Sequence, residues 1–256
     1  MTEEVRTRRS SAPSRLRRLR RGDRTELWTE TAGSPPSVYG ERWKEIGGRM
    51  CRSFDPRRSK LAAAIAHDWS GDLPRNGERW LYLGAASGTT ASHVADLVGP
   101  SGRVYAIEKS LRPFARLLQL SGRWLNLLPI LADARTPEEY ADLVPPVDGV
   151  YEDIAQPDQI EIVRRNASLF LRAEGCPLLI ALKTASMGRT RPPAAYLAAA
   201  EEALEPAVEL EPSVRLDPFH RAHYLVGGRA RRNLFPGDLG GSVSSMPGRR
   251  HGARRR

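Results

Sequence analysis

The stretch at 79–90, RWLYLGAASGTT, decides the fold of this chain, together with the segment ASHVADLV at 91–98. An apolar run ends at Gly84, a loop of small residues closes at Gly88, and an apolar segment with helical spacing follows two hydroxyl residues. This order predicts a strand, a tight loop and a helix, the first unit of a Rossmann-like sheet. Glycine at both ends of the loop permits positive φ, and the helix start offers unpaired N–H groups to a small ligand.

Departures from better-known loops narrow the choice of ligand. No lysine follows Gly88, which excludes the phosphate loop of nucleoside triphosphatases, and the third glycine of the dinucleotide fingerprint is missing. The second predicted strand, 103–108, ends in Glu108, about 20 residues after the loop, where a carboxylate can bind ribose hydroxyls. The third strand, 127–133, ends in Asp133, which suits the adenine edge. These three strand ends favour S-adenosylmethionine, and a nucleotide fold with ordinary polar loop ends is the alternative.

The remainder of the body alternates predicted strands with predicted helices. We expect helices over 60–67, 113–120, 137–143, 156–171 and 194–204, strands over 147–153 and 176–183, and a closing antiparallel pair from 208–216 and 223–227. This alternation predicts an α/β fold, a Rossmann-like methyltransferase sheet with a terminal antiparallel hairpin. Aromatic residues among glycine and proline turns at 25–55 predict a small N-terminal β element before it.

Asp153 and Lys183 end the fourth and fifth predicted strands. Ligands of doubly wound sheets lie across the carboxyl ends of the strands, so both side chains should reach one cleft beside the cofactor. A purely structural ion pair is the alternative. Lys60 stands in the first turn of the helix over 60–67, where the helix dipole disfavours a cation, and this position hints at a function. A solvated lysine is the plainer interpretation.

Three phrases carry a family resemblance: LGAASGTT at 83–90, DIAQPDQ at 153–159 and RSKLAAA at 58–64. They closely resemble the matching motifs of fibrillarin, the ribose 2′-O-methyltransferase of box C/D ribonucleoproteins, and the likeness runs in order from about residue 38 to 228. The resemblance implies S-adenosylmethionine as cofactor, no metal, and guide-directed 2′-O-methylation of rRNA, with tRNA as a further substrate. The implied partners are a box C/D guide RNA, a Nop-family scaffold protein and a kink-turn-binding ribosomal-like protein.

The resemblance also implies which residues act. The Lys-Asp-Lys-His catalytic set of the family matches Lys60, Asp153, Lys183 and His223. In this scheme Lys183 lies nearest the 2′-oxygen, Asp153 orients that lysine, and His223 fixes the ribose or its neighbouring phosphate. Members of the family commonly have an acidic residue before this histidine, whereas Ala222 stands here, and His220 is the alternative for the role.

The implied cofactor-binding residues come from the ends of the first four strands. They are Gly84, Ala85, Ser87, Gly88, Thr89, Thr90, Glu108, Asp133, Ala134, Asp153 and Gln156. The first six would surround the methionine moiety and the adjacent ribose, although Thr89 and Thr90 could instead only cap the helix.

Charge is concentrated at the two ends of the 256-residue chain, whose formal net charge is +10. Residues 1–24 hold nine arginines against three acidic residues, a net +6, and residues 229–256 hold eight against one, a net +7, which leaves −3 for the body. We therefore expect disordered basic arms at 1–24 and 229–256 that attract RNA in a salt-dependent way, around a methyltransferase domain at 56–228. Residues 15–21 could become helical on RNA. Solubilising tails are the alternative.

The cysteines and the hydropathy of the chain limit the cellular compartments in which we expect the protein. Cys51 and Cys176 lie far apart in the sequence, which argues against a disulfide framework or a structural zinc site. No apolar run reaches membrane length and the N-terminal segment lacks the apolar core of a signal peptide. We expect an intracellular protein without a membrane partner, cytoplasmic in an archaeon and nucleolar in a eukaryote.

Two other functions stay open at this point. A stand-alone RNA 2′-O-methyltransferase would use its basic arms in place of the guide particle and would lose RNA binding when they are removed. A non-catalytic RNA-binding subunit of the particle has no need of Lys60, Asp153 and Lys183, so these residues argue against it.

Overall fold

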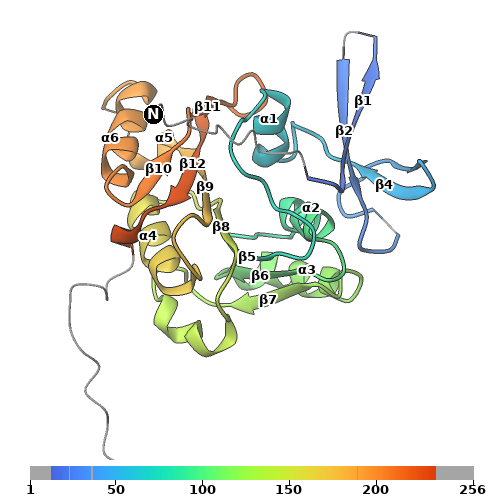
Figure 1. Ribbon diagram of the computed structural model, residues 1–256, viewed down its shortest axis with the longest axis horizontal. Helices are drawn as coiled ribbons and strands as arrows, with labels where there is room; N and C mark the ends of the chain where they lie inside the picture. Colours follow the sequence, from blue (N-terminus) through green and yellow to red (C-terminus); the bar gives the residue numbers. More distant parts are fainter. Residues whose placement is uncertain (1–12, 23, 36, 189, 235–256) are drawn as a thin grey trace, which may run out of the picture.

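The computed structural model describes residues 13–22, 24–35, 37–188 and 190–234. Its N-terminal part is an antiparallel sheet in the order β1-β2-β4-β3, which stands beside the main sheet in Figure 1. The strands are β1 (Leu16–Arg21), β2 (Arg24–Glu30), β3 (Trp43–Ile46) and β4 (Arg49–Ser53). Gly47 and Gly48 join β3 to β4 with φ of 60° and 72°, as a two-residue hairpin turn with positive φ at both positions requires. The predicted N-terminal β element is confirmed.

The first strand corrects our expectation of a disordered arm over 1–24. Leu16 is buried with Leu27 in the core, and Arg15 forms an ion pair with Glu30 at 2.8 Å. Arg15 Nε also donates to the carbonyl of Asp96 at 2.7 Å. The arginine-rich segment therefore forms a strand in the chain by itself, because its neighbours supply both an apolar surface and acidic partners. Residues 1–12 of the expected arm lie outside the described residues.

The main sheet has the order β10-β12-β9-β8-β5-β6-β7, and β11 also pairs with β12. Its strands are β5 (Arg79–Leu83), β6 (Arg103–Glu108), β7 (Leu127–Leu131), β8 (Gly149–Glu152), β9 (Pro177–Lys183), β10 (Val208–Leu210), β11 (Val214–Arg215) and β12 (His223–Ala230). Strands β5 to β9 run parallel, and β12 runs antiparallel to β9. The predicted methyltransferase sheet with its antiparallel end is confirmed. The expected strand at 208–216 is split around Pro212, which has no N–H for a strand ladder.

Helices cover both faces of the main sheet (Figure 1). One face carries α1 (Lys60–Ala66), α2 (Thr89–Val98) and α3 (Leu111–Ser121), and the other carries η1 (Pro137–Leu143), α4 (Gln159–Phe170) and α6 (Pro193–Leu204). Two short helices, α5 (Thr184–Met187) and η2 (Arg232–Leu234), follow β9 and β12. The helix expected over 137–143 is a 3₁₀ helix. The expected start of the basic tail at residue 229 is too early, because β12 extends to Ala230 and η2 follows it. The rest of the expected tail, residues 235–256, lies outside the described residues.

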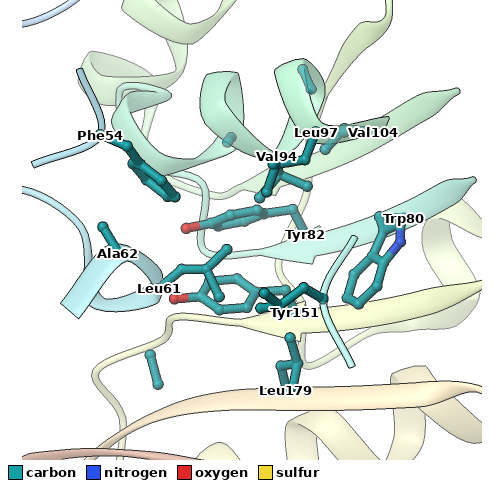
Figure 2. Packing of buried hydrophobic residues seen from close by; sticks show 14 of the residues in the cluster. Phe54, Leu61, Ala62, Trp80, Tyr82, Val94, Leu97, Val104, Tyr151 and Leu179 are labelled. Atoms are coloured by element: carbon teal, nitrogen blue, oxygen red, sulfur yellow. The ribbon is translucent and has the colours of Figure 1, made fainter. Parts of the chain in front are cut away.

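Strand β5 fills both layers of the core. Trp80 and Tyr82 belong to the cluster under α1 and α2, whereas Leu81 and Leu83 belong to the cluster under α4. Figure 2 shows Tyr82 packed between the α2 side of this cluster and Tyr151, whose ring centroid lies 4.8 Å away. A strand with buried side chains on both faces is typical of the centre of a parallel sheet. The core therefore fixes the end of β5, where the loop singled out in the sequence begins.

Candidate functional site

The loop after β5 depends on its two glycines. Gly84 and Gly88 have φ of 77° and 89°, which confirms the expected positive φ at both positions. A Cβ on Gly84 would lie 2.8 Å from the backbone oxygen of Asp153, and one on Gly88 would lie 2.5 Å from Leu120 Cδ2. The glycines thus let the loop fit closely between the end of β8 and helix α3, and in this way they set the shape of the cleft.

A cleft opens at the carboxyl ends of β5, β6, β7 and β8. Six residues of the predicted cofactor set line it: Gly84, Glu108, Asp133, Ala134, Asp153 and Gln156. Glu108 is 9% exposed, and its carboxylate accepts from the N–H of Ala86 at 2.9 Å and of Ser110 at 2.7 Å. A carboxylate has about four acceptor sites, so Glu108 retains capacity for ribose hydroxyls. The donor set and its placement fit an adenosine-bearing cofactor.

The other five residues of the predicted set do not line this cleft. They are Ala85, Ser87, Gly88, Thr89 and Thr90. Thr90 is buried and donates to Ser59 Oγ at 3.1 Å, and Ser59 caps α1 by accepting from the N–H of Ala62 at 3.3 Å. Helix α2 has Gly88 at its N-cap and no side-chain capping bond. The interpretation of Thr89 and Thr90 as the cap of their own helix is therefore wrong, and Thr90 instead connects the cofactor loop to the start of α1.

Arg135 lines the cleft and was missed by our reasoning from the sequence. Its Nη2 donates to Gln156 Oε1 at 3.0 Å, and its Nε donates to Asp158 Oδ2 at 2.7 Å. These bonds hold the segment between β8 and α4 against the end of β7, and the bond from Arg135 lowers the pKa of Asp158. A basic residue two positions after Asp133 was the only signal in the sequence.

Lys60 and Asp153 meet at the edge of this cleft although they are 93 residues apart. Lys60 Nζ lies 2.6 Å from Asp153 Oδ1, with side chains 22% and 17% exposed. Lys60 is the first residue of α1, and Asp153 directly follows β8, where its N–H donates to the carbonyl of Leu83 at 2.9 Å. The carboxylate offsets the unfavourable position of a lysine at a helix start. In the described residues Asp153 therefore pairs with Lys60, not with Lys183 as expected.

Lys183 is the last residue of β9 and lies opposite His223 in the strand register. Its side chain is half-buried, and its ammonium group makes no hydrogen bond or ion pair with any residue that the structure describes. The next residue, Thr184, donates through its hydroxyl to the carbonyl of Ala222 at 2.9 Å. The end of β9 is thus held in place by Thr184 next to a lysine whose ammonium has no partner among the described residues.

The two histidines near this site differ in their anchors. His220 Nε2 lies 2.8 Å from the carbonyl of Pro56, just before α1, and His223 Nδ1 lies 2.8 Å from the carbonyl of Arg221. A carbonyl only accepts, so we assign the proton of His223 to Nδ1, which leaves Nε2 as an acceptor in the neutral ring. Burial, with the nearby charge of Lys60, lowers the pKa of both histidines, so both are neutral at pH 7.

Within the described ranges, no three His, Cys, Asp or Glu side chains are grouped so that they could hold a metal ion. No helix in the same ranges has the length and apolar character that a membrane span needs.

The sequence of this chain is similar to those of known proteins along most of its length. The sequence profile described as Fibrillarin matches residues 17–232. The chain belongs to the fibrillarin family. A fibrillarin-like rRNA/tRNA 2′-O-methyltransferase of Aeropyrum pernix is 44% identical over 197 residues, which cover 76% of this chain and 84% of that protein.

Solved structures of the fibrillarin family are also similar to this chain. Aeropyrum pernix fibrillarin in complex with natively bound S-adenosyl-L-methionine has a TM-score of 0.73 and 41% identity, covering 81% of this chain and 90% of that one. The fibrillarin in a fibrillarin/Nop5p complex has a TM-score of 0.71 and 40% identity, covering 80% and 94%.

Proposed function

We propose that this chain is an S-adenosylmethionine-dependent ribose 2′-O-methyltransferase that acts on rRNA, and on tRNA, under the direction of a box C/D guide RNA. The observation that carries the proposal is the Lys60–Asp153 pair at the edge of the cofactor cleft, with Lys183 and His223 side by side at the end of the neighbouring strands. Family membership supplies the reaction class, and this arrangement supplies the groups that the reaction needs.

The cofactor cleft would hold its ligand through groups at successive strand ends. Glu108 would accept from the ribose hydroxyls, Asp133 and Ala134 would face the adenine, and Gln156, fixed by Arg135, would close the side near Asp153. When bound, S-adenosylmethionine supplies a methyl group that is electrophilic because it is attached to a sulfonium. Asp153 keeps a negative charge close to that end of the cleft, and Lys60 holds the carboxylate in one orientation.

The ribose side of the reaction falls to Lys183 and His223. The 2′-oxygen would form the new bond to the methyl group as the bond from that methyl to the sulfonium sulfur breaks and leaves a neutral thioether, and the proton of the 2′-hydroxyl would pass to solvent water. The Lys183 ammonium, which has no partner among the described residues, stabilises the 2′-oxygen as the proton leaves. His223 presents Nε2 as an acceptor and orients the ribose through a neighbouring hydroxyl. Each histidine has one ring nitrogen bonded to a carbonyl, and the position of His223 opposite Lys183 in the strand register favours His223 for this role.

We further propose that a Nop-family scaffold docks on a leucine surface formed by α3, the following loop and β7. Its members are Leu111, Leu118, Leu125 and Leu131, which are between 46% and 81% exposed. Strand β7 is at the edge of the main sheet and α3 packs against it. Exposed large apolar side chains at the edge of a sheet are candidates for a protein interface, and a relative 40% identical to this chain has been solved with Nop5p. The guide RNA and a kink-turn-binding protein would complete the particle, inside the cell where rRNA is made.

The scaffold proposal is tested by changing charge on this surface. Leu118→Glu should abolish co-purification with a Nop5-type scaffold and leave the free chain folded. Leu169→Glu is the matched control, because Leu169 is also half-exposed, at 48%, but lies on α4 on the other face of the sheet. Equal binding by the two variants would contradict the proposed surface.

The catalytic proposal is tested by Lys183→Ala in the assembled particle. With saturating cofactor, methyl transfer should fall about 100-fold or more, while the cofactor Kd changes less than about twofold. Normal turnover at saturation together with weakened cofactor binding would show that Lys183 serves the cofactor and would overturn the role given to it.

A further inference from the structure

Strand β9 extends beyond its neighbour β8. The parallel pairing of these strands stops where Glu152 faces Ile180, because the chain leaves β8 at Asp153 and turns toward α4. Strand β9 continues for three more residues, as far as Lys183. The edge of Lys183 that faces away from β12 therefore has no strand to bond with, and a buried peptide group left in this state is costly.

Gln159 fills that gap with its side-chain amide. It is fully buried at the first position of α4, its Oε1 accepts from the N–H of Lys183 at 3.2 Å, and its Nε2 donates to the carbonyl of Lys183 at 3.4 Å. On the opposite edge the N–H of Thr184 donates to the carbonyl of Ala222 at 3.2 Å. The side-chain amide of Gln159 thus makes the two hydrogen bonds that a neighbouring strand would otherwise make to the backbone of Lys183.

We propose that Gln159 is a positioning residue that sets the place of Lys183 relative to Asp153. The inference rests on the proposed function, because it matters for catalysis only if Lys183 acts on the 2′-oxygen. The connection from β8 to α4 begins with Asp153, which is anchored on Leu83, and ends with Gln159, which is anchored on Lys183. The short segment from Asp153 to Gln159 therefore connects the acid to the lysine. The hydrogen bonds between Gln159 and Lys183 fix its second end.

A double-mutant cycle in the assembled particle tests this role. Gln159→Met keeps the length of the side chain and removes both hydrogen bonds. Single-turnover methyl transfer at saturating cofactor should fall about tenfold, because a small displacement of a reacting group lowers the rate steeply. The cofactor Kd should stay within about twofold. In a Lys183→Ala background, the same change should lower the remaining rate by less than about twofold, because a residue that acts through Lys183 has nothing left to position.

A matched control separates positioning from loss of stability. Asn126 is another buried amide, and its Nδ2 donates to the carbonyls of Ala95 at 2.7 Å and Gly99 at 2.8 Å, at the far end of α2. Asn126→Leu should destabilise the fold about as much as Gln159→Met does in urea unfolding, and should leave the single-turnover rate within about twofold of the original.

The outcomes distinguish a failure of the role given to Gln159 from a failure of the role given to Lys183. Equal rate losses in Gln159→Met and Asn126→Leu would show a structural role only and overturn the proposal. Independent, multiplicative effects of Gln159→Met and Lys183→Ala would also overturn it. If Lys183→Ala keeps the full rate, the proposed function of Lys183 fails first, and the cycle shows this before Gln159 is considered.

Discussion

Two ion pairs of similar length occupy different regions of this molecule. Arg52 and Asp96 join the N-terminal sheet to α2 at 2.8 Å, with both side chains 0% exposed. Lys60 and Asp153 meet at the cofactor cleft at 2.6 Å, with side chains 22% and 17% exposed. The two N–O distances do not distinguish the structural pair from the pair that we propose to be functional, but the other hydrogen bonds of the two carboxylates do.

The carboxylate of Asp96 is saturated. Its Oδ1 accepts from the N–H of Ala32 and the indole N–H of Trp124, and its Oδ2 accepts from the Thr29 hydroxyl and Arg52 Nε, all at 2.8 Å. Such a group has no capacity left for a ligand. Breaking a buried, saturated pair leaves charges without partners, which costs several kcal/mol.

The carboxylate of Asp153 is far less occupied. Its Oδ1 accepts from Lys60, whereas its Oδ2 has no hydrogen bond to any side chain or backbone group in the described ranges. The same residue lines the cofactor cleft. The comparison teaches that spare acceptor capacity at an open edge, not the presence of an ion pair, distinguishes the site that we propose for the chemistry.

The largest expected effect is on stability and comes from Arg52→Met. Removing the guanidinium leaves Asp96 and Glu41 buried without their cation, so the free energy of unfolding should fall by about 3–5 kcal/mol. At a temperature where the variant stays folded, the cofactor Kd should change less than about threefold. Urea unfolding measures the first quantity and calorimetric titration the second. A loss below about 1 kcal/mol would remove the distinction between the two pairs.

Asp153→Asn should have a small effect on stability and a large effect on methyl transfer, the reverse of the pattern expected for Arg52→Met. The pair with Lys60 is partly exposed, so the free energy of unfolding should change by about 1 kcal/mol or less. Methyl transfer in the assembled particle should fall about 100-fold, because the negative charge at the cleft is lost. Unfolding and single-turnover measurements on one preparation test both statements. A variant as unstable as Arg52→Met with a normal rate would reverse the assignment of the two regions.

A smaller effect is expected in the pH dependence of the buried region. His93 is fully buried beside Asp96, and burial and the charge of Arg52 lower its pKa well below the usual value. The unfolded chain then binds more protons than the folded one, so stability should fall as the pH drops below about 6.5, by up to about 1.4 kcal/mol per pH unit. His93→Gln should remove that part of the slope between pH 6.5 and 5.

Glu152 has the opposite sign, because burial raises its pKa well above the usual value and its contribution weakens stability as the pH rises above about 4.5. Glu152 is present both in the original chain and in the His93→Gln variant. Only the difference between their slopes of unfolding free energy against pH therefore reports on His93. Identical slopes for the original chain and His93→Gln would contradict a neutral, buried His93.

The order of the strands and helices could be predicted from the sequence because it depends on local periodicity and loop residues. The arm at 1–24 could not, since the strand at Leu16–Arg21 forms only through the distant partners Leu27, Glu30 and Asp96. Lys60 and Asp153 are 93 residues apart in the sequence, and their contact depends on how distant elements pack together. Only the family resemblance placed both residues in one site.

The details around the site were beyond prediction for the same reason. Thr90 looked like a helix cap until the structure placed it against Ser59 on another helix. Nothing local to Gln159 signals that its amide would complete the edge of β9. Side chains that bond to the backbone of a distant strand leave no periodic pattern in a sequence.

The most direct test of the central claim is transfer of labelled methyl from S-adenosylmethionine to RNA by the chain assembled with scaffold, kink-turn-binding protein and guide. The target carries either a ribose or a 2′-deoxyribose at the guided nucleotide, and each reaction is run with and without guide. We predict labelling that needs the guide and is lost with the deoxy target. Equal labelling of the deoxy target, or no labelling although the cofactor binds, would contradict ribose 2′-O-methylation, and labelling without guide would contradict the particle and favour a stand-alone enzyme.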